Sequence, residues 1–108
     1  MALKWIMKQH DTLPSLELTL LDGTTPVDLS AADSALFLMR NFGGLKVNSA
    51  MTFVDRVHGK VRYDWVTGDT DTASDYDAEV QITWADLRIQ TFPADQYITV
   101  SVEADLGP

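Results

Sequence analysis

Apolar and polar residues alternate most regularly between residues 76 and 84. The apolar positions share one side of an extended chain: Tyr76, Ala78, Val80, Ile82 and Trp84. The polar positions share the other side: Asp77, Glu79, Gln81 and Thr83. A period of two residues is typical of a strand with one face in a core and the other in water. We therefore predict a β-strand over residues 76–84.

Shorter patterns of the same kind divide the rest of the chain. Three segments alternate clearly: residues 16–20, 61–66 and 98–102. Three more give short or irregular patterns: residues 27–29, 46–54 and 87–91. Turn-forming pairs separate several of these segments: Asp22-Gly23, Gly43-Gly44 and His58-Gly59. Since such pairs typically reverse the chain, we predict short strands joined by tight turns.

Residues 35–40 differ, because they are apolar on both faces until Arg40. This pattern is typical of a strand that is covered on both sides or lies at an interface, although a helix is also compatible with it. Just before it, residues 30–34 are compatible with a single helical turn, with Ser30 as the N-cap.

About seven short strands, turns roughly every 8–12 residues and no alternation with helices predict an all-β fold. We expect an antiparallel immunoglobulin-like β-sandwich with at most one short helical turn, built as a single domain over residues 1–108. The cysteine pair of true immunoglobulin domains is missing, so the likeness would be architectural. The first few residues and residues 104–108 are expected to be tails.

The amino-acid composition limits the classes of partner and the cellular compartment that we expect for the chain. The chain has 8 lysines and arginines against 16 aspartates and glutamates, a net charge of −8, which repels nucleic acid and anionic membranes. No signal-peptide core and no apolar run near the roughly 20 residues of a membrane helix is present. Without cysteine there are no disulfides, which suits folding in a cytoplasm. We therefore predict neither nucleic acid nor a membrane as partner.

An acidic loop follows residues 61–66. Its carboxylates Asp69, Asp71 and Asp75 are weak candidates for calcium ligands, with Asp64 or Asp77 as a supplement. The loop lacks the glycine and the closing glutamate of a complete calcium loop. The simpler interpretation is a solvated hairpin loop whose aspartates and threonines cap backbone amides.

No residue pattern indicates catalysis. His10 and His58 are the only histidines, and both lie next to turn signals, so we predict exposed loop histidines. The serines have no nucleophile motif around them. We therefore predict a protein that is not an enzyme, with no catalytic residue and no cofactor.

The aromatic residues allow two interpretations. Tyr63, Trp65, Tyr76 and Trp84 have the phase of the inward aliphatic residues, which favours core packing over a sugar-stacking platform. Trp5 stands apart in the segment Lys4, Trp5, Ile6 and Met7. This segment is predicted to form an interface, and Trp5 docks either on its own sandwich or on a neighbour.

An ordered set of landmarks extends over nearly the whole chain. In the first half they are Trp5 and residues 8–12 (KQHDT), 16–20 (LELTL), 22–30 (DGTTPVDLS) and 37–40 (FLMR). In the second half they are residues 59–65 (GKVRYDW), 68–70 (GDT), 76–79 (YDAE), 91–93 (TFP) and 98–100 (ITV). In this order the landmarks are similar to the N-terminal domain of phage baseplate upper proteins. One departure is Leu87, which stands where that pattern usually has a glycine.

The resemblance implies an immunoglobulin-like sandwich in a phage or prophage virion, folded in the host cytoplasm. It implies a structural tail or baseplate assembly or adaptor module, with other tail or baseplate proteins as partners and a homo-oligomeric state in the virion. It implies no catalytic residues and no obligate cofactor. The alternative function is a small calcium- or carbohydrate-binding β-sandwich module, which the acidic loop and the tryptophans suggest.

Overall fold

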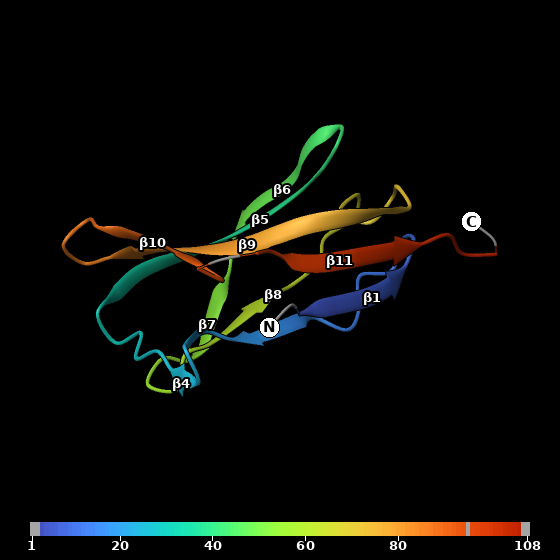
Figure 1. Ribbon diagram of the computed structural model, residues 1–108. Coiled ribbons are helices and arrows are strands. Elements are labelled where there is room, and N and C mark those ends of the chain that lie inside the picture. Colours follow the sequence, from blue (N-terminus) through green and yellow to red (C-terminus); the bar gives the residue numbers. More distant parts are fainter. Residues whose placement is uncertain (1–2, 95, 107–108) are drawn as a thin grey trace.

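The structure is a computed structural model that describes residues 3–94 and 96–106 (Figure 1). Its larger sheet contains, in spatial order, β1 (Lys4–Lys8), β11 (Ile98–Glu103), β9 (Ser74–Trp84), β5 (Ala32–Asn41) and β6 (Gly44–Ala50), and β10 (Ile89–Phe92) also pairs with β9. Its smaller sheet contains β2 (Leu16–Thr19), β8 (Lys60–Tyr63) and β7 (Thr52–Asp55). A short ladder joins β3 (Leu21–Asp22) to β4 (Thr25–Pro26). The predicted all-β sandwich is confirmed.

Strand pairing is antiparallel with one exception. β1 runs parallel to β11, with Lys4 opposite Thr99 and Lys8 opposite Glu103. Figure 1 shows these two strands, from opposite ends of the chain, side by side. The predicted purely antiparallel arrangement therefore needs this correction, because the alternation within a strand carries no information about the direction of its partner.

The core lies between the two sheets. The apolar face predicted for β9 is buried there, with Tyr76 and Val80 almost inaccessible. Phe37 of β5 stacks on Tyr63 of β8, with 4.7 Å between ring centroids, so this pair links the larger sheet to the smaller one. Trp65 packs edge-on against both rings. The core interpretation of these aromatic side chains is correct.

Residues 35–40 belong to β5 and are extended rather than helical. Phe37 and Met39 point into the core and are fully buried. Leu36 and Leu38 lie on the opposite face of the strand and are half-buried. The apolar outer face therefore reflects a position in the middle of a sheet, next to β9 on one side and β6 on the other.

The irregular segment 46–54 forms two strands in different sheets. β6 ends at Ala50, Met51 is buried, and β7 begins at Thr52 in the smaller sheet. The amide of Met51 donates to the carbonyl of Ala35 at 2.9 Å, which holds the crossing chain against β5. A strand that changes sheets cannot keep one alternating pattern, and this explains the irregularity.

No helix occurs in residues 3–94 and 96–106, which agrees with the prediction of at most one short helical turn. The turn considered at residues 30–34 does not form, and other local predictions were wrong. Ser30 instead donates from its amide to Asp28 Oδ1 at 2.9 Å, and β5 begins two residues later. Residues 27–29 are not a strand, β1 replaces the expected N-terminal tail, and the strand predicted from Leu87 begins at Ile89. Met1, Ala2, Gly107 and Pro108 lie outside the described residues. No helix in the described part of the chain could span a membrane.

Two turns place a residue in the left-handed backbone region, a leucine in one turn and a glycine in the other. Leu87, in the β9–β10 turn, has φ 71° and is 79% exposed, and its amide donates to the carbonyl of Trp84 at 2.8 Å. Gly59 has φ 72°, and a Cβ there would lie 2.7 Å from the carbonyl oxygen of Val27. Leucine is strained in this region, whereas glycine is not.

Leu87→Gly is therefore expected to raise the free energy of unfolding by about 0.5–1 kcal/mol, because strain is relieved and little packing is lost. Gly59→Ala is expected to lower it by more than about 1 kcal/mol, because strain is added and the new methyl group meets backbone atoms. Urea denaturation of both variants measures this, and a destabilised Leu87→Gly variant would contradict the assignment of strain.

Candidate functional site

The acidic loop is tied to the core by Tyr63. The hydroxyl of Tyr63 donates to Asp69 Oδ2 at 2.6 Å, and the amide of Val66 donates to the same oxygen at 3.0 Å. Burial, followed by the nearby Asp69 carboxylate, raises the pKa of Tyr63 above its ordinary value. Asp69 therefore acts as a cap that folds the loop back on the end of β8.

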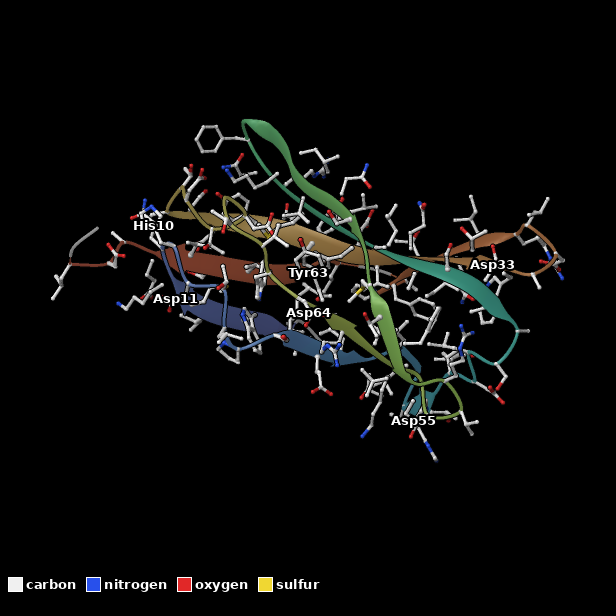
Figure 2. The ribbon with its side chains drawn as sticks, turned by 180° about the vertical axis from the view of Figure 1, so that it is seen from behind. His10, Asp11, Asp33, Asp55, Tyr63 and Asp64 are labelled. Carbon is white, nitrogen blue, oxygen red and sulfur yellow. The ribbon has the colours of Figure 1, made fainter. Side chains whose placement is uncertain are left out.

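The other candidate carboxylates have separate partners. Asp71 forms a salt bridge with Lys46, and this lysine holds the pKa of Asp71 below its ordinary value. Asp75 accepts from the hydroxyl of Ser101 at 2.7 Å. Asp64, labelled with Tyr63 in Figure 2, accepts from the hydroxyl of Ser15 at 2.7 Å.

These contacts do not assemble the calcium ligands that the sequence suggested. Among residues 3–94 and 96–106, no three histidine, aspartate or glutamate side chains gather around one point that could hold a metal ion. Calcium takes six to eight oxygen ligands, so the loop does not provide its usual environment. The hairpin interpretation of the loop describes Asp69 better, since Asp69 caps a backbone amide.

Both histidines are exposed, as the sequence predicted. His58 lies in the turn before β8, where its Nδ1 is 2.8 Å from Asp55 Oδ2. This pair is local, because the two residues are three apart in the sequence. Lys60 lies close enough to Asp55 to lower its pKa, after the larger effect of the His58 hydrogen bond.

His10 has a partner from the other end of the chain. Its Nδ1 lies 3.5 Å from Asp105 Oδ2, although 95 positions separate the two residues. The parallel pairing of β1 and β11 explains this contact, because Lys8 faces Glu103 and the next two residues of each segment leave the sheet side by side. Figure 2 shows His10 and Asp11 at the end of the sandwich from which the C-terminal segment extends.

Backbone hydrogen bonds hold the His10 turn in place. His10 has φ 72°, and its amide donates to the carbonyl of Thr70 at 2.9 Å. The hydroxyl of Thr70, which is 1% exposed, donates to the carbonyl of Asp11 at 2.8 Å. The amide of Gln9 donates to Glu103 at 2.7 Å. The imidazole is therefore presented from a turn that is bonded to both β11 and the acidic loop.

Sequence reasoning missed Asp105, because residues 104–108 read as a tail. No local signal in the sequence could have found it. Only the parallel register of β1 with β11, continued past both strands, places Asp105 beside His10.

The N-terminal segment divides between core and surface. Met7 is buried, and Trp5 is partly buried against the core of its own sandwich. Ile6 is 58% exposed and Lys4 is exposed. Of the residues predicted to form an interface, only Lys4 and Ile6 are thus available to a partner, and that role stays a prediction.

The structure is a small immunoglobulin-like β-sandwich that carries the His10–Asp105 pair at one of its ends. No family model matches the chain, and no curated protein matches it significantly. The crystal structure of CopC from Methylosinus trichosporium OB3b is similar to it, with a TM-score of 0.58 over 99% of this chain and 90% of that chain. The two sequences are 10% identical, so the likeness shows the fold alone.

The predicted function needs correction. A structural role in a phage tail or baseplate is wrong on this comparison, because the solved structure that is similar over nearly the full chain is that of CopC, and not that of a baseplate protein. The family resemblance that suggested the role is untested and stays a prediction.

Tyr63→Phe is expected to lower the free energy of unfolding by about 1–3 kcal/mol at pH 7, because the Asp69 carboxylate loses a donor. The wild type should also lose stability above about pH 10, where the unfolded tyrosine ionises while the folded one keeps its proton. The Tyr63→Phe variant should lose less stability over this pH range, because it lacks the ionising hydroxyl. Urea denaturation between pH 7 and 11 measures both effects.

Tyr97→Phe is the matched control, since Tyr97 is exposed and its hydroxyl accepts from the exposed side chain of Arg40. Its effect should stay within about 0.5 kcal/mol. Equal effects of the two substitutions would contradict the anchoring role of Tyr63.

Proposed function

We propose that this chain is a small, non-catalytic binding module that takes a divalent transition-metal ion at the His10–Asp105 end of the sandwich. The observation that carries the proposal is the 3.5 Å approach of His10 Nδ1 to Asp105 Oδ2. An imidazole and a carboxylate from opposite ends of the chain meet there only because the fold brings them together.

The donor set selects the class of metal. Imidazole with carboxylate suits Cu²⁺ and Zn²⁺, and sites of this kind generally bind Cu²⁺ most tightly. Calcium is unsuited, because it prefers a cage of oxygen ligands. Copper is therefore the first metal to test.

The fit is that of an open site rather than a closed cage. His10 and Asp105 supply two protein donors, and no third histidine, aspartate or glutamate joins them within the described residues. Other coordination positions would be left to water or to a group from outside the chain. His10 is also among the causes that lower the pKa of Asp71, after the larger effects of Lys46 and Thr72, so the acidic loop lies near this end.

Carbohydrate binding receives less support. Tyr63, Trp65 and Tyr76 are at most 5% exposed, and they cannot offer ring faces to a sugar. Of the other aromatic residues on which that alternative depended, Trp5 and Trp84 pack partly buried against the core, and Tyr97 is exposed.

The test is calorimetric titration of the protein with Cu²⁺ and Zn²⁺, with electron paramagnetic resonance of the copper complex to detect nitrogen ligation. His10→Ala is expected to raise the Kd for Cu²⁺ at least about tenfold, which corresponds to about 1.4 kcal/mol of binding free energy. Asp105→Asn should weaken binding in the same direction, because a charged donor is lost.

His58→Ala is the matched control, because His58 also lies beside a carboxylate, but in a local turn away from the His10–Asp105 end. It should change the Kd by less than about twofold, below a free-energy difference of roughly 0.4 kcal/mol. Absence of saturable copper binding, or equal losses in the His10 and His58 variants, would overturn the proposal.

A further inference from the structure

The turn between β5 and β6 exposes an aromatic side chain. Phe42 stands in this turn, between Asn41 and Gly44, and is fully exposed. Leu45, three residues further along the chain, is 58% exposed. Tight turns usually hold glycine or short polar residues, whereas aromatic residues are typical anchors of protein interfaces. We call Phe42 and Leu45 the hairpin tip.

Hydrogen bonds hold the hairpin tip in one position. Asn41 Oδ1 accepts from the amide of Gly43 at 2.8 Å, which closes the turn. Asn41 Nδ2 donates to Ser74 Oγ at 3.2 Å, and this bond ties the base of the turn to the first residue of β9. Figure 1 shows the β5–β6 hairpin extending away from the rest of the larger sheet. An anchor that is already held in place loses little conformational entropy on binding.

A groove of about 650 Å³ lies at the other end of β5. Its apolar lining consists of Ala31, Trp84, Ala85 and Ile89. Trp84 is partly buried against the core, whereas Ile89 is 62% exposed. The amide of Ala85 donates to the carbonyl of Ala31 at 2.9 Å, which joins the two chain segments that border the groove. We call it the Trp84 groove.

The charged residues of the Trp84 groove neutralise each other. Arg88 Nε lies 2.8 Å from Asp86 Oδ2, and the amide of Arg88 donates to the same carboxylate at 3.2 Å. The remaining polar residue of the lining, Gln90, is uncharged. A groove without net charge favours an uncharged side chain, because a charged one would lose its water without gaining a partner. The Trp84 groove therefore suits an apolar insert.

Leu87 lies between the paired residues of this groove and is 79% exposed. Its φ of 71° strains a leucine backbone, and an exposed side chain has little packing within its own chain to offset that strain. A molecule that covered the β9–β10 turn would supply the missing apolar contacts. The turn is therefore a second feature that indicates an interface at this end.

The hairpin tip cannot reach the Trp84 groove of its own molecule. The two features lie at opposite ends of β5, where Ala32 pairs with Trp84 and Asn41 pairs with Gly44. The ten residues of this strand extend over roughly 30 Å. A contact between a hairpin tip and a Trp84 groove therefore joins two molecules.

We propose that the hairpin tip of one copy of this chain inserts into the Trp84 groove of a second copy. The occupant is a second copy because the chain itself carries both halves of the contact, an exposed apolar anchor and an uncharged apolar groove. The two surfaces differ, so the contact is head-to-tail, and each added copy leaves one tip and one groove free. Only one hairpin tip enters each groove, so we expect weak association. The proposal does not rest on metal binding by His10 and Asp105.

Sedimentation velocity between about 10 μM and 1 mM protein measures this association, with a chelator present so that metal ions cannot bridge molecules. The wild type should form dimers and then longer species as its concentration rises. Raising the salt from about 50 to 500 mM should strengthen the association. Salt screens the repulsion between molecules of net charge −8 and leaves apolar contacts intact.

Substitutions at exposed positions separate the two halves of the contact. Phe42→Ser and Ile89→Ser should each raise the Kd of self-association at least about tenfold, because an apolar anchor or a groove wall is lost. Leu87→Gly should also weaken self-association although it raises the free energy of unfolding, a combination that general destabilisation would not produce. Val57→Ser is the matched control, because Val57 is 57% exposed in the β7–β8 turn, and it should change the Kd less than about twofold.

An equimolar mixture of the Phe42→Ser and Ile89→Ser variants distinguishes a head-to-tail contact from a symmetric one. The first variant keeps its groove and the second keeps its tip. The mixture should therefore recover dimers with about the wild-type affinity, but no longer species. A symmetric contact through a single surface would not be recovered by mixing.

Three results would overturn the proposal. The first is a monomer at every concentration and salt, which would leave the hairpin tip to a different protein. The second is self-association that Phe42→Ser and Val57→Ser change equally. The third is a mixture of the Phe42→Ser and Ile89→Ser variants that stays monomeric.

Discussion

The parallel pairing of β1 with β11 is the constraint on which the rest of the structure depends. It closes one edge of the larger sheet with the N-terminal strand and turns Trp5 and Met7 into the core. It also directs the chain beyond both strands to the same end of the sandwich. His10 and Asp105 meet there because the register that pairs Lys8 with Glu103 continues past the sheet.

The aromatic contact between the sheets also holds the acidic loop beside the His10 turn. Phe37 stacks on Tyr63 inside the core, and the Tyr63 hydroxyl reaches out to Asp69. The carbonyl of Thr70, the next residue, accepts a hydrogen bond from the amide of His10. The acidic loop thus supports this end: its carboxylates hold the loop, and the loop holds the turn that presents the imidazole.

Features set by local chemistry could be predicted from the sequence. The burial of the alternating face of β9 and the core position of Trp65 followed from the phase of the apolar residues. Features set by distant pairing could not. The direction of β1, the change of sheet at Met51 and the partner of His10 all depend on residues far away in the sequence. The predicted phage function failed for a related reason, since it rested on an ordered resemblance and not on a site.

The central claim is the parallel register of β1 with β11, and the absence of native cysteine makes it directly testable. Lys8→Cys/Glu103→Cys places two thiols at paired positions, whereas Lys4→Cys/Glu103→Cys places them four residues out of register, roughly 13 Å apart. Under mild oxidation only the first variant should form an intramolecular disulfide, since a disulfide requires close Cα atoms. Cross-linking of the Lys4 variant, with none in the Lys8 variant, would contradict the parallel pairing and the site built on it.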